Sequence, residues 1–136
     1  MTLLLLIALP FVASLAIAAA GARAWIWHSG IAALASALGL ILLATLAPSV
    51  LAGQIPAVSI AWVPALGLDL SLMVDPLGLM FAGLILGIGL LVVIFGHFYL
   101  ASGEATGRFF ASLMLFQGAM LGIVISGNVL LLLIFW

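Results

Sequence analysis

Long runs of apolar residues, broken by short polar segments, make up most of this chain. A helix that crosses a bilayer needs about 20 predominantly apolar residues. The runs predict complete spanning helices at residues 2–20, 31–52, 76–100 and 108–125, and the start of a fifth helix at 128–136. The pattern therefore predicts an all-α polytopic membrane protein with four complete transmembrane helices, in which residues 1–136 form a single membrane domain.

The segment at residues 54–75, between the second and third helices, has a different pattern. Apolar and polar residues alternate along 68–75, and a period of two is typical of a strand with one buried face. A similar alternation runs along 58–62, and residues 63–67 between them supply proline and glycine for a turn. We therefore expect a short β-hairpin on the membrane surface.

The composition agrees with a lipid environment. The chain is 69% hydrophobic and 4% charged, whereas a soluble domain carries about 25% charged residues. A net charge of −1 provides no basic patch for nucleic acid. The sequence contains no nucleophile elbow, phosphate loop or dinucleotide fingerprint. We therefore expect no catalytic residue, no metal ligand and no cofactor.

The two arginines predict how the chain is oriented. Arg23 lies with His28 in the expected loop at 21–30, and Arg108 begins the fourth helix. Alternating spans place both arginines on one side, which the positive-inside rule makes the cytoplasmic side. The first apolar run has no positive segment before it, unlike a signal peptide. We expect a multi-pass membrane protein with its N-terminus and hairpin outside the cell.

The last apolar run is too short to cross a bilayer. The residues after Asn128 extend about 12 Å as a helix, less than half of a core about 30 Å thick. The pattern therefore predicts a fifth span that is cut off. The alternative is one long, tilted helix over 108–136, which would give a four-span protein.

Small residues recur at a spacing of four in the third and fourth helices. Gly83 and Gly87 form one such pair, and Gly118 and Gly122 form the other. Such stripes let helix backbones approach closely in lipid. We interpret them as packing surfaces, with a glycine-lined pore as the alternative.

Two polar side chains within the spans are candidates for a proton path. His97 lies near the end of the third helix, and histidine is the side chain best suited to exchange protons near neutral pH. Gln117 lies near the middle of the fourth helix, where an amide could line a hydrated path. The structural alternatives are a solvated His97 at the interface and a Gln117 hydrogen-bonded to a neighbouring helix.

The remaining polar residues are expected to stabilise helix ends. Asp75 precedes Pro76 and is placed to cap the third helix, and Asn128 is placed to cap the fifth. Glu104 and Arg108 are four residues apart and could form an exposed ion pair at the start of the fourth helix.

Several motifs resemble those of antiporter-type membrane subunits. They are DPLG at 75–78, GHFYL at 96–100, RFF at 108–110, SGN at 126–128 and FW at 135–136. The family comprises the large A-type and D-type proteins of Mrp-type sodium/proton antiporters and the proton-pumping subunits of respiratory complex I. The run WVPALG, which begins at Trp62, most resembles the A-type protein.

This resemblance implies a scaffold segment in the ion-translocating bundle of a multisubunit monovalent cation (Na+)/proton antiporter. It implies other membrane subunits as partners, protons and monovalent cations as cargo, and contact with the lipid bilayer. In the family, a glutamate essential for proton transfer follows the tryptophan that matches Trp136, and a lysine on a later helix completes the pair. Neither residue is present in this sequence.

Two other functions stay open from the sequence. The chain could belong to a redox-driven proton pump of the complex I type or a related membrane hydrogenase, in which case soluble iron–sulfur partners would be expected. It could instead be a complete four-span assembly or scaffold protein, and a stop codon would then follow Trp136.

Overall fold

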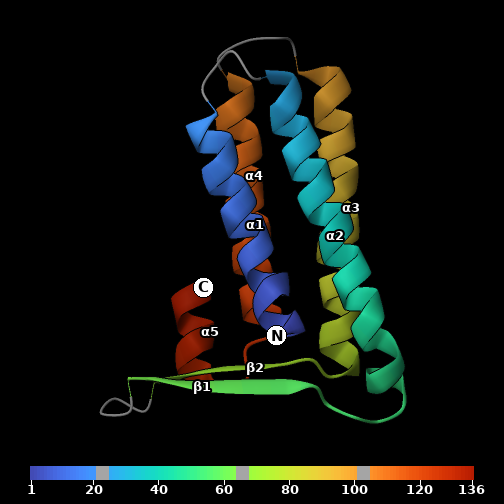
Figure 1. Ribbon diagram of the computed structural model, residues 1–136, viewed down its shortest axis with the longest axis vertical. Coiled ribbons are helices and arrows are strands. Elements are labelled where there is room, and N and C mark those ends of the chain that lie inside the picture. The colour runs from blue at the N-terminus through green and yellow to red at the C-terminus, as the bar shows by residue number, and fades with distance from the viewer. Residues whose placement is uncertain (21–24, 64–67, 101–104) are drawn as a thin grey trace.

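Four long helices stand side by side, and a two-stranded hairpin lies across one end of them (Figure 1). The computed structural model describes residues 1–20, 25–63, 68–100 and 105–136. The elements are α1 (Thr2–Ala19), α2 (Trp25–Leu51), β1 (Ala57–Val63), β2 (Leu68–Met73), α3 (Pro76–Tyr99), α4 (Ala105–Val124) and α5 (Val129–Phe135). The predicted fold class, a helical membrane bundle with a hairpin between the second and third helices, is confirmed.

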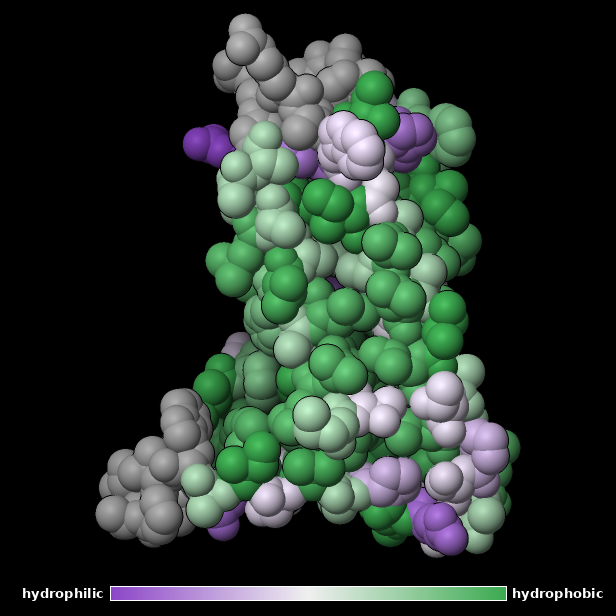
Figure 2. All heavy atoms as spheres, viewed as in Figure 1, coloured by the Kyte–Doolittle hydropathy of each residue, from purple (hydrophilic) through white to green (hydrophobic). Residues whose placement is uncertain are grey.

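The sides of the bundle are apolar and its ends are more polar. In the described part of the chain, α1, α2, α3 and α4 are each long and apolar enough to cross a membrane. Figure 2 shows hydrophobic residues along the length of the bundle and hydrophilic ones gathered toward its two ends. Exposed leucine, isoleucine and phenylalanine side chains are suited to contact with lipid. A helix is also suited to lipid because it satisfies its own backbone hydrogen bonds. The chain is therefore a multi-pass membrane protein.

The second helix begins earlier than its sequence pattern predicts. We expected a loop over 21–30, but α2 starts at Trp25, so His28 lies within the helix. His28, Ala32 and Ser36 are four residues apart and all are at most 1% exposed. Because residues at this spacing share one face of a helix, burial of that face extends α2 toward its N-terminus. The fourth helix likewise begins at Ala105, ahead of the predicted start at 108.

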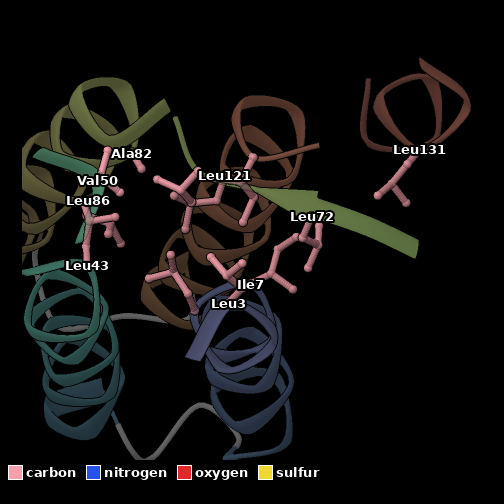
Figure 3. Packing of buried hydrophobic residues seen from close by; sticks show 12 residues of the cluster. Leu3, Ile7, Leu43, Val50, Leu72, Ala82, Leu86, Leu121 and Leu131 are labelled. Atoms are coloured by element: carbon pink, nitrogen blue, oxygen red, sulfur yellow. The ribbon is translucent and has the colours of Figure 1, made fainter. Parts of the chain in front are cut away.

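The interior consists of two apolar clusters. The one nearer the hairpin, shown in Figure 3, draws residues from all of α1, α2, α3, α4, α5 and β2. Its buried members are Leu3, Leu6, Ile7, Leu43, Val50, Leu72, Val74, Ala82, Leu86, Leu121, Ile125 and Leu131. The other cluster is formed by Ala13, Ile17, Ala32, Ala35, Val93, Phe110 and Met114. Residues of β2 thus belong to the same core as the helices.

The hairpin is an antiparallel pair whose alternation decides which side chains are buried. Its register pairs Val58 with Leu72 and Ala61 with Asp69. Leu72 and Val74 are fully buried, whereas Asp69 is exposed. The strand places its apolar face against the bundle, as the period of two predicts.

A second partner lies along the other edge of β2. The Met73 amide donates to the Ile125 carbonyl at 2.8 Å, and the Gly127 amide donates to the Ser71 carbonyl at 2.8 Å. These bonds belong to the connection between α4 and α5, so its backbone pairs with the strand instead of continuing the helix. The alternative of one continuous helix over 108–136 is therefore wrong. The chain turns at this connection, and α5 lies beside the lower part of α4 (Figure 1).

Candidate functional site: polar groups inside the bundle

The amide of Gln117 links three helices in the interior. Gln117 is 3% exposed, and its Oε1 accepts a hydrogen bond from Ser36 Oγ of α2 at 3.1 Å. The amide lies against Gly89 of α3, where an added Cβ would be 2.8 Å from both Cδ and Nε2 of Gln117. Because Gly89 has no side chain, the Gln117 amide of α4 fits against α3 at this point and forms its hydrogen bond with Ser36 of α2.

One half of this amide has no partner. Among the residues that the structure describes, Gln117 Nε2 is buried without a hydrogen-bond acceptor. Gln117 also lines an apolar pocket of about 230 Å³ between α3 and α4, beside Ile88 and Phe116. A buried donor without an acceptor costs about 1–3 kcal/mol. The amide is thus both a structural link and an unsatisfied polar group near the middle of the bundle.

Substitutions at Ser36 and at Gln117 are expected to lower the free energy of unfolding by different amounts. We expect Ser36→Ala to lower the free energy of unfolding by about 1–3 kcal/mol, because it leaves Gln117 Oε1 buried without a donor. We expect Gln117→Leu to cost under about 1 kcal/mol, because it also removes the unsatisfied Nε2, and the Ser36 hydroxyl can donate to its own helix. Unfolding of the two purified variants in detergent measures the difference. A greater loss for Gln117→Leu would contradict this account of the pair.

His97 lies at the end of the bundle opposite the hairpin. It is exposed, and its Nδ1 is 2.7 Å from the hydroxyl of Ser29, which is 5% exposed. The same hydroxyl is 3.2 Å from the Ile26 carbonyl and can donate to it. When it does, Ser29 Oγ accepts from Nδ1–H, and Nε2 of His97 is the nitrogen left to accept a proton. His97 and Ser29 both line a groove of about 270 Å³ between α2 and α3.

His28 is buried at the same end of the bundle, and the sequence pattern did not single it out. It is 1% exposed, and neither ring nitrogen has a hydrogen-bond partner among the described residues. Its ring lies beside Gly107 of α4, where an added Cβ would be 3.0 Å from Cε1. The four-residue spacing of His28, Ala32 and Ser36 was the signal that could have predicted this burial.

Two of the expected helix caps have the geometry of caps. Asp75 Oδ1 accepts from the Gly78 amide at 2.6 Å at the start of α3. Asn128 Oδ1 accepts from the Leu130 amide at 3.0 Å at the start of α5. Arg108 is exposed, and its expected partner Glu104 lies outside the described residues, as does Arg23.

The glycine pair of α4 lies under two aromatic rings. An added Cβ at Gly118 would be 2.9 Å from Cε2 of Phe11 in α1, and one at Gly122 would overlap the ring of Phe135 in α5. The two rings are themselves 6.3 Å apart, centroid to centroid. The small residues of α4 therefore receive an aromatic side chain from each of two neighbouring helices.

The glycine pair of α3 does not form the close contact that its spacing suggests. An added Cβ at Gly87 would meet nothing within 4 Å, and one at Gly83 would be in ordinary contact with Leu43 at 3.6 Å. The buried face of α3 instead carries Ala82, Leu86, Gly89, Val93 and Gly96. Gly83 and Gly87 each lie next to a member of that face, so the helix turns them away from the tightest packing.

Comparisons with known proteins agree with this architecture. Residues 61–110 match the family model of the N-terminus of chain 5 of NADH-ubiquinone oxidoreductase (complex I). A probable A/B-type component of a K(+)/H(+) antiporter from Rhizobium meliloti is 41% identical over 110 residues, which are 81% of this chain and 11% of that protein. An A1-type component of a Na(+)/H(+) antiporter from Staphylococcus aureus is 43% identical over 96 residues, which are 71% of this chain and 12% of that protein.

A solved structure extends the likeness to the full length of the chain. All of this chain aligns with 14% of a chain in the Mrp complex from Dietzia sp. DQ12-45-1b, with a TM-score of 0.69 and 29% sequence identity. The fold and sequence are thus similar to those of antiporter-type membrane subunits. Within that class the chain is related to the N-terminal part of the A-type protein of Mrp antiporters, which confirms the resemblance of the motifs. It spans only 11% to 14% of the length of these relatives.

Proposed function

We propose that the chain is the N-terminal membrane segment of the A-type protein in a multisubunit monovalent cation/proton antiporter. The alignment of the whole chain with a component of the Mrp complex is the observation that carries this proposal. The chain would lie in the bacterial plasma membrane with its N-terminus and hairpin outside, because Lys and Arg accumulate on the cytoplasmic side. Its partners would be the other membrane subunits of the same complex.

The segment's role in this proposal is that of a scaffold for the translocating helices. In the described part of the spans, the buried polar side chains are those of serine, threonine, glutamine and His28, and none of them is a carboxylate, an ammonium or a guanidinium. Moving ions through lipid requires paired charges or hydrated cavities in the spans. The paired charges that exchange requires would therefore lie in other parts of the protein, while this bundle holds those parts in place. His97 and Gln117 are the proposed points at which it could contact a proton path.

An ion-exchange assay tests the proposal. The complete gene cluster would be expressed in a bacterial strain that lacks its own sodium/proton antiporters, and everted vesicles would be energised by respiration. We expect added Na+ or K+ to discharge the preformed pH gradient, and an empty-vector strain not to show this discharge. No cation-dependent discharge from an assembled complex would overturn the proposal.

The match of residues 61–110 to a complex I family model favours a second candidate, a redox-driven proton pump. The same vesicles separate the two. A pump subunit predicts formation of a pH gradient that depends on an electron donor and on soluble iron–sulfur partners, without any requirement for Na+ or K+.

The exposed position of His97 gives a further prediction. We expect His97→Ala to lower the exchange rate by no more than about twofold, because water offers parallel proton donors at an interfacial site. The rate should be normalised to the amount of assembled complex. Complete loss of exchange with normal assembly would instead make His97 an essential proton donor or acceptor.

A further inference from the structure

His28 is the one ionisable side chain that the structure describes as fully enclosed by the helices. Its 1% exposure contrasts with that of Trp27, the preceding residue, which is 71% exposed and faces outward. Both ring nitrogens lack a partner among the described residues. Replacing this ring with a leucine or phenylalanine would suit an apolar interior better, so the histidine requires a chemical explanation.

The chemistry of imidazole defines which hydrogen-bond partners the two ring nitrogens require. A neutral ring carries one N–H donor and one lone-pair acceptor, and a protonated ring carries two donors. Buried polar groups are almost always hydrogen-bonded to protein or to ordered water. Because the described protein groups provide no partner, water is the candidate ligand for both nitrogens, and buried waters commonly bridge such groups.

The location of His28 makes water entry feasible. His28 is in the first turn of α2, about 4.5 Å along the axis from the first residue of that helix. On the facing helix, Gly107 is close to the first residue of α4, and its lack of a side chain lets the His28 ring pack directly against the backbone of that helix. The imidazole therefore lies only about one helical turn from the start of each of these two helices.

We propose that His28 is a hydrated proton-binding site inside the bundle, reached from the end opposite the hairpin. A hydronium ion donates a proton to the nitrogen that holds the lone pair and leaves as water, and an N–H bond of the imidazolium can then break to return a proton to water, which becomes hydronium. The imidazole gains one positive charge in the first step and loses it in the second. That these protons belong to cation/proton exchange rests on the proposed function.

Among the described residues, His28 is the only titratable side chain that is buried at this end of the bundle. The other titratable or charged side chains described there are His97 and Tyr99 of α3 and Arg108 of α4, and all three are exposed. Toward the middle of the bundle, Ala32 and Met114 are fully buried in the apolar cluster. Water around His28 is therefore expected to stop at this cluster instead of continuing to Gln117.

Radiolytic hydroxyl-radical footprinting of the native complex tests the hydration directly. Radicals formed from bound water label adjacent side chains, and mass spectrometry measures each labelling rate. Met114 is the dry control, because it is fully buried and methionine reacts with hydroxyl radicals faster than histidine does; Trp27 is the exposed control. We expect His28 to be labelled at least about tenfold faster than Met114, because buried water remains in contact with polar groups. Equal protection of His28 and Met114 would overturn the proposal.

Variants test the proton-binding step. We expect His28→Gln and His28→Phe to remove a pH-dependent component of the exchange rate and to lower the maximal rate by about tenfold or more. Ser112→Ala is the control, since its exposed hydroxyl donates to the Phe109 carbonyl within its own helix. Unchanged pH profiles in an assembled His28→Gln complex would overturn proton binding. If the wild-type complex exchanges no cation, the proposed function fails, while the footprinting result still decides whether the site is hydrated.

Discussion

Replacing Leu72 with alanine is expected to lower the free energy of unfolding of the native protein by about 2–5 kcal/mol. Leu72 is fully buried, and it brings the hairpin into the cluster that contains Leu3, Leu121 and Leu131. Truncation would leave a cavity where the strand and three helices meet, and close-packed interiors relax only partly around such a cavity. Denaturant-induced unfolding in detergent, followed by tryptophan fluorescence, would measure the loss.

Ile60 is the matched control for Leu72. It is an aliphatic residue of the same size on the neighbouring strand, and it is 44% exposed. We expect Ile60→Ala to change the free energy of unfolding by less than about 1 kcal/mol, as surface substitutions commonly do. Equal losses for the two variants would mean that the hairpin is not part of the helical core.

Replacing Gly122 with valine is expected to push α5 away from α4. An added Cβ at Gly122 would overlap the ring of Phe135, and that ring is also in contact with Phe11 of α1. Overpacking of this kind costs about 1–3 kcal/mol, since the ring must leave its place between the helices. Loss of thermal stability and increased protease cleavage near α5 would report the displacement.

Gly87 provides the matched control for Gly122. It is also a glycine within a spanning helix, but an added Cβ there would meet nothing within 4 Å. We expect Gly87→Val to be tolerated by the packing of this bundle. If Gly87→Val were as harmful as Gly122→Val, the effect would come from the helix backbone or from a partner subunit, and not from the Phe135 contact.

The sequence predicted the kinds of elements well because their signals are physical and local. Apolar length identified the spans, and the alternation that buries Leu72 and exposes Asp69 identified the hairpin. The pairing of β2 with the α4–α5 connection could not be predicted, because it joins segments far apart in the chain. Only the break at Gly127 and Asn128 indicated that the helix ends there.

The sequence could not predict which face of each helix turns inward. In a soluble protein the outward face is polar, so its pattern reveals the buried side. In lipid both faces are apolar, so the spacing of Gly83 and Gly87 does not say whether they or Gly89 contact a neighbour. His28 was missed for another reason: the sequence pattern predicts a loop over 21–30, although α2 begins at Trp25 and places His28 on the same face as Ala32 and Ser36.

β2 pairs with β1 along one edge and with the α4–α5 connection along the other, and this double pairing determines how this end of the protein opens. Along one edge of β2, the Met73 amide donates to the Ile125 carbonyl of the α4–α5 connection. The Gly127 amide of that connection donates back to the Ser71 carbonyl of the strand. Neither bond can separate far without the other, so the strand and the α4–α5 turn form one cooperative unit. The amide protons of Met73 and Gly127 should therefore exchange with deuterium at a common rate. Any tilt of α5 would also move the β1–β2 hairpin.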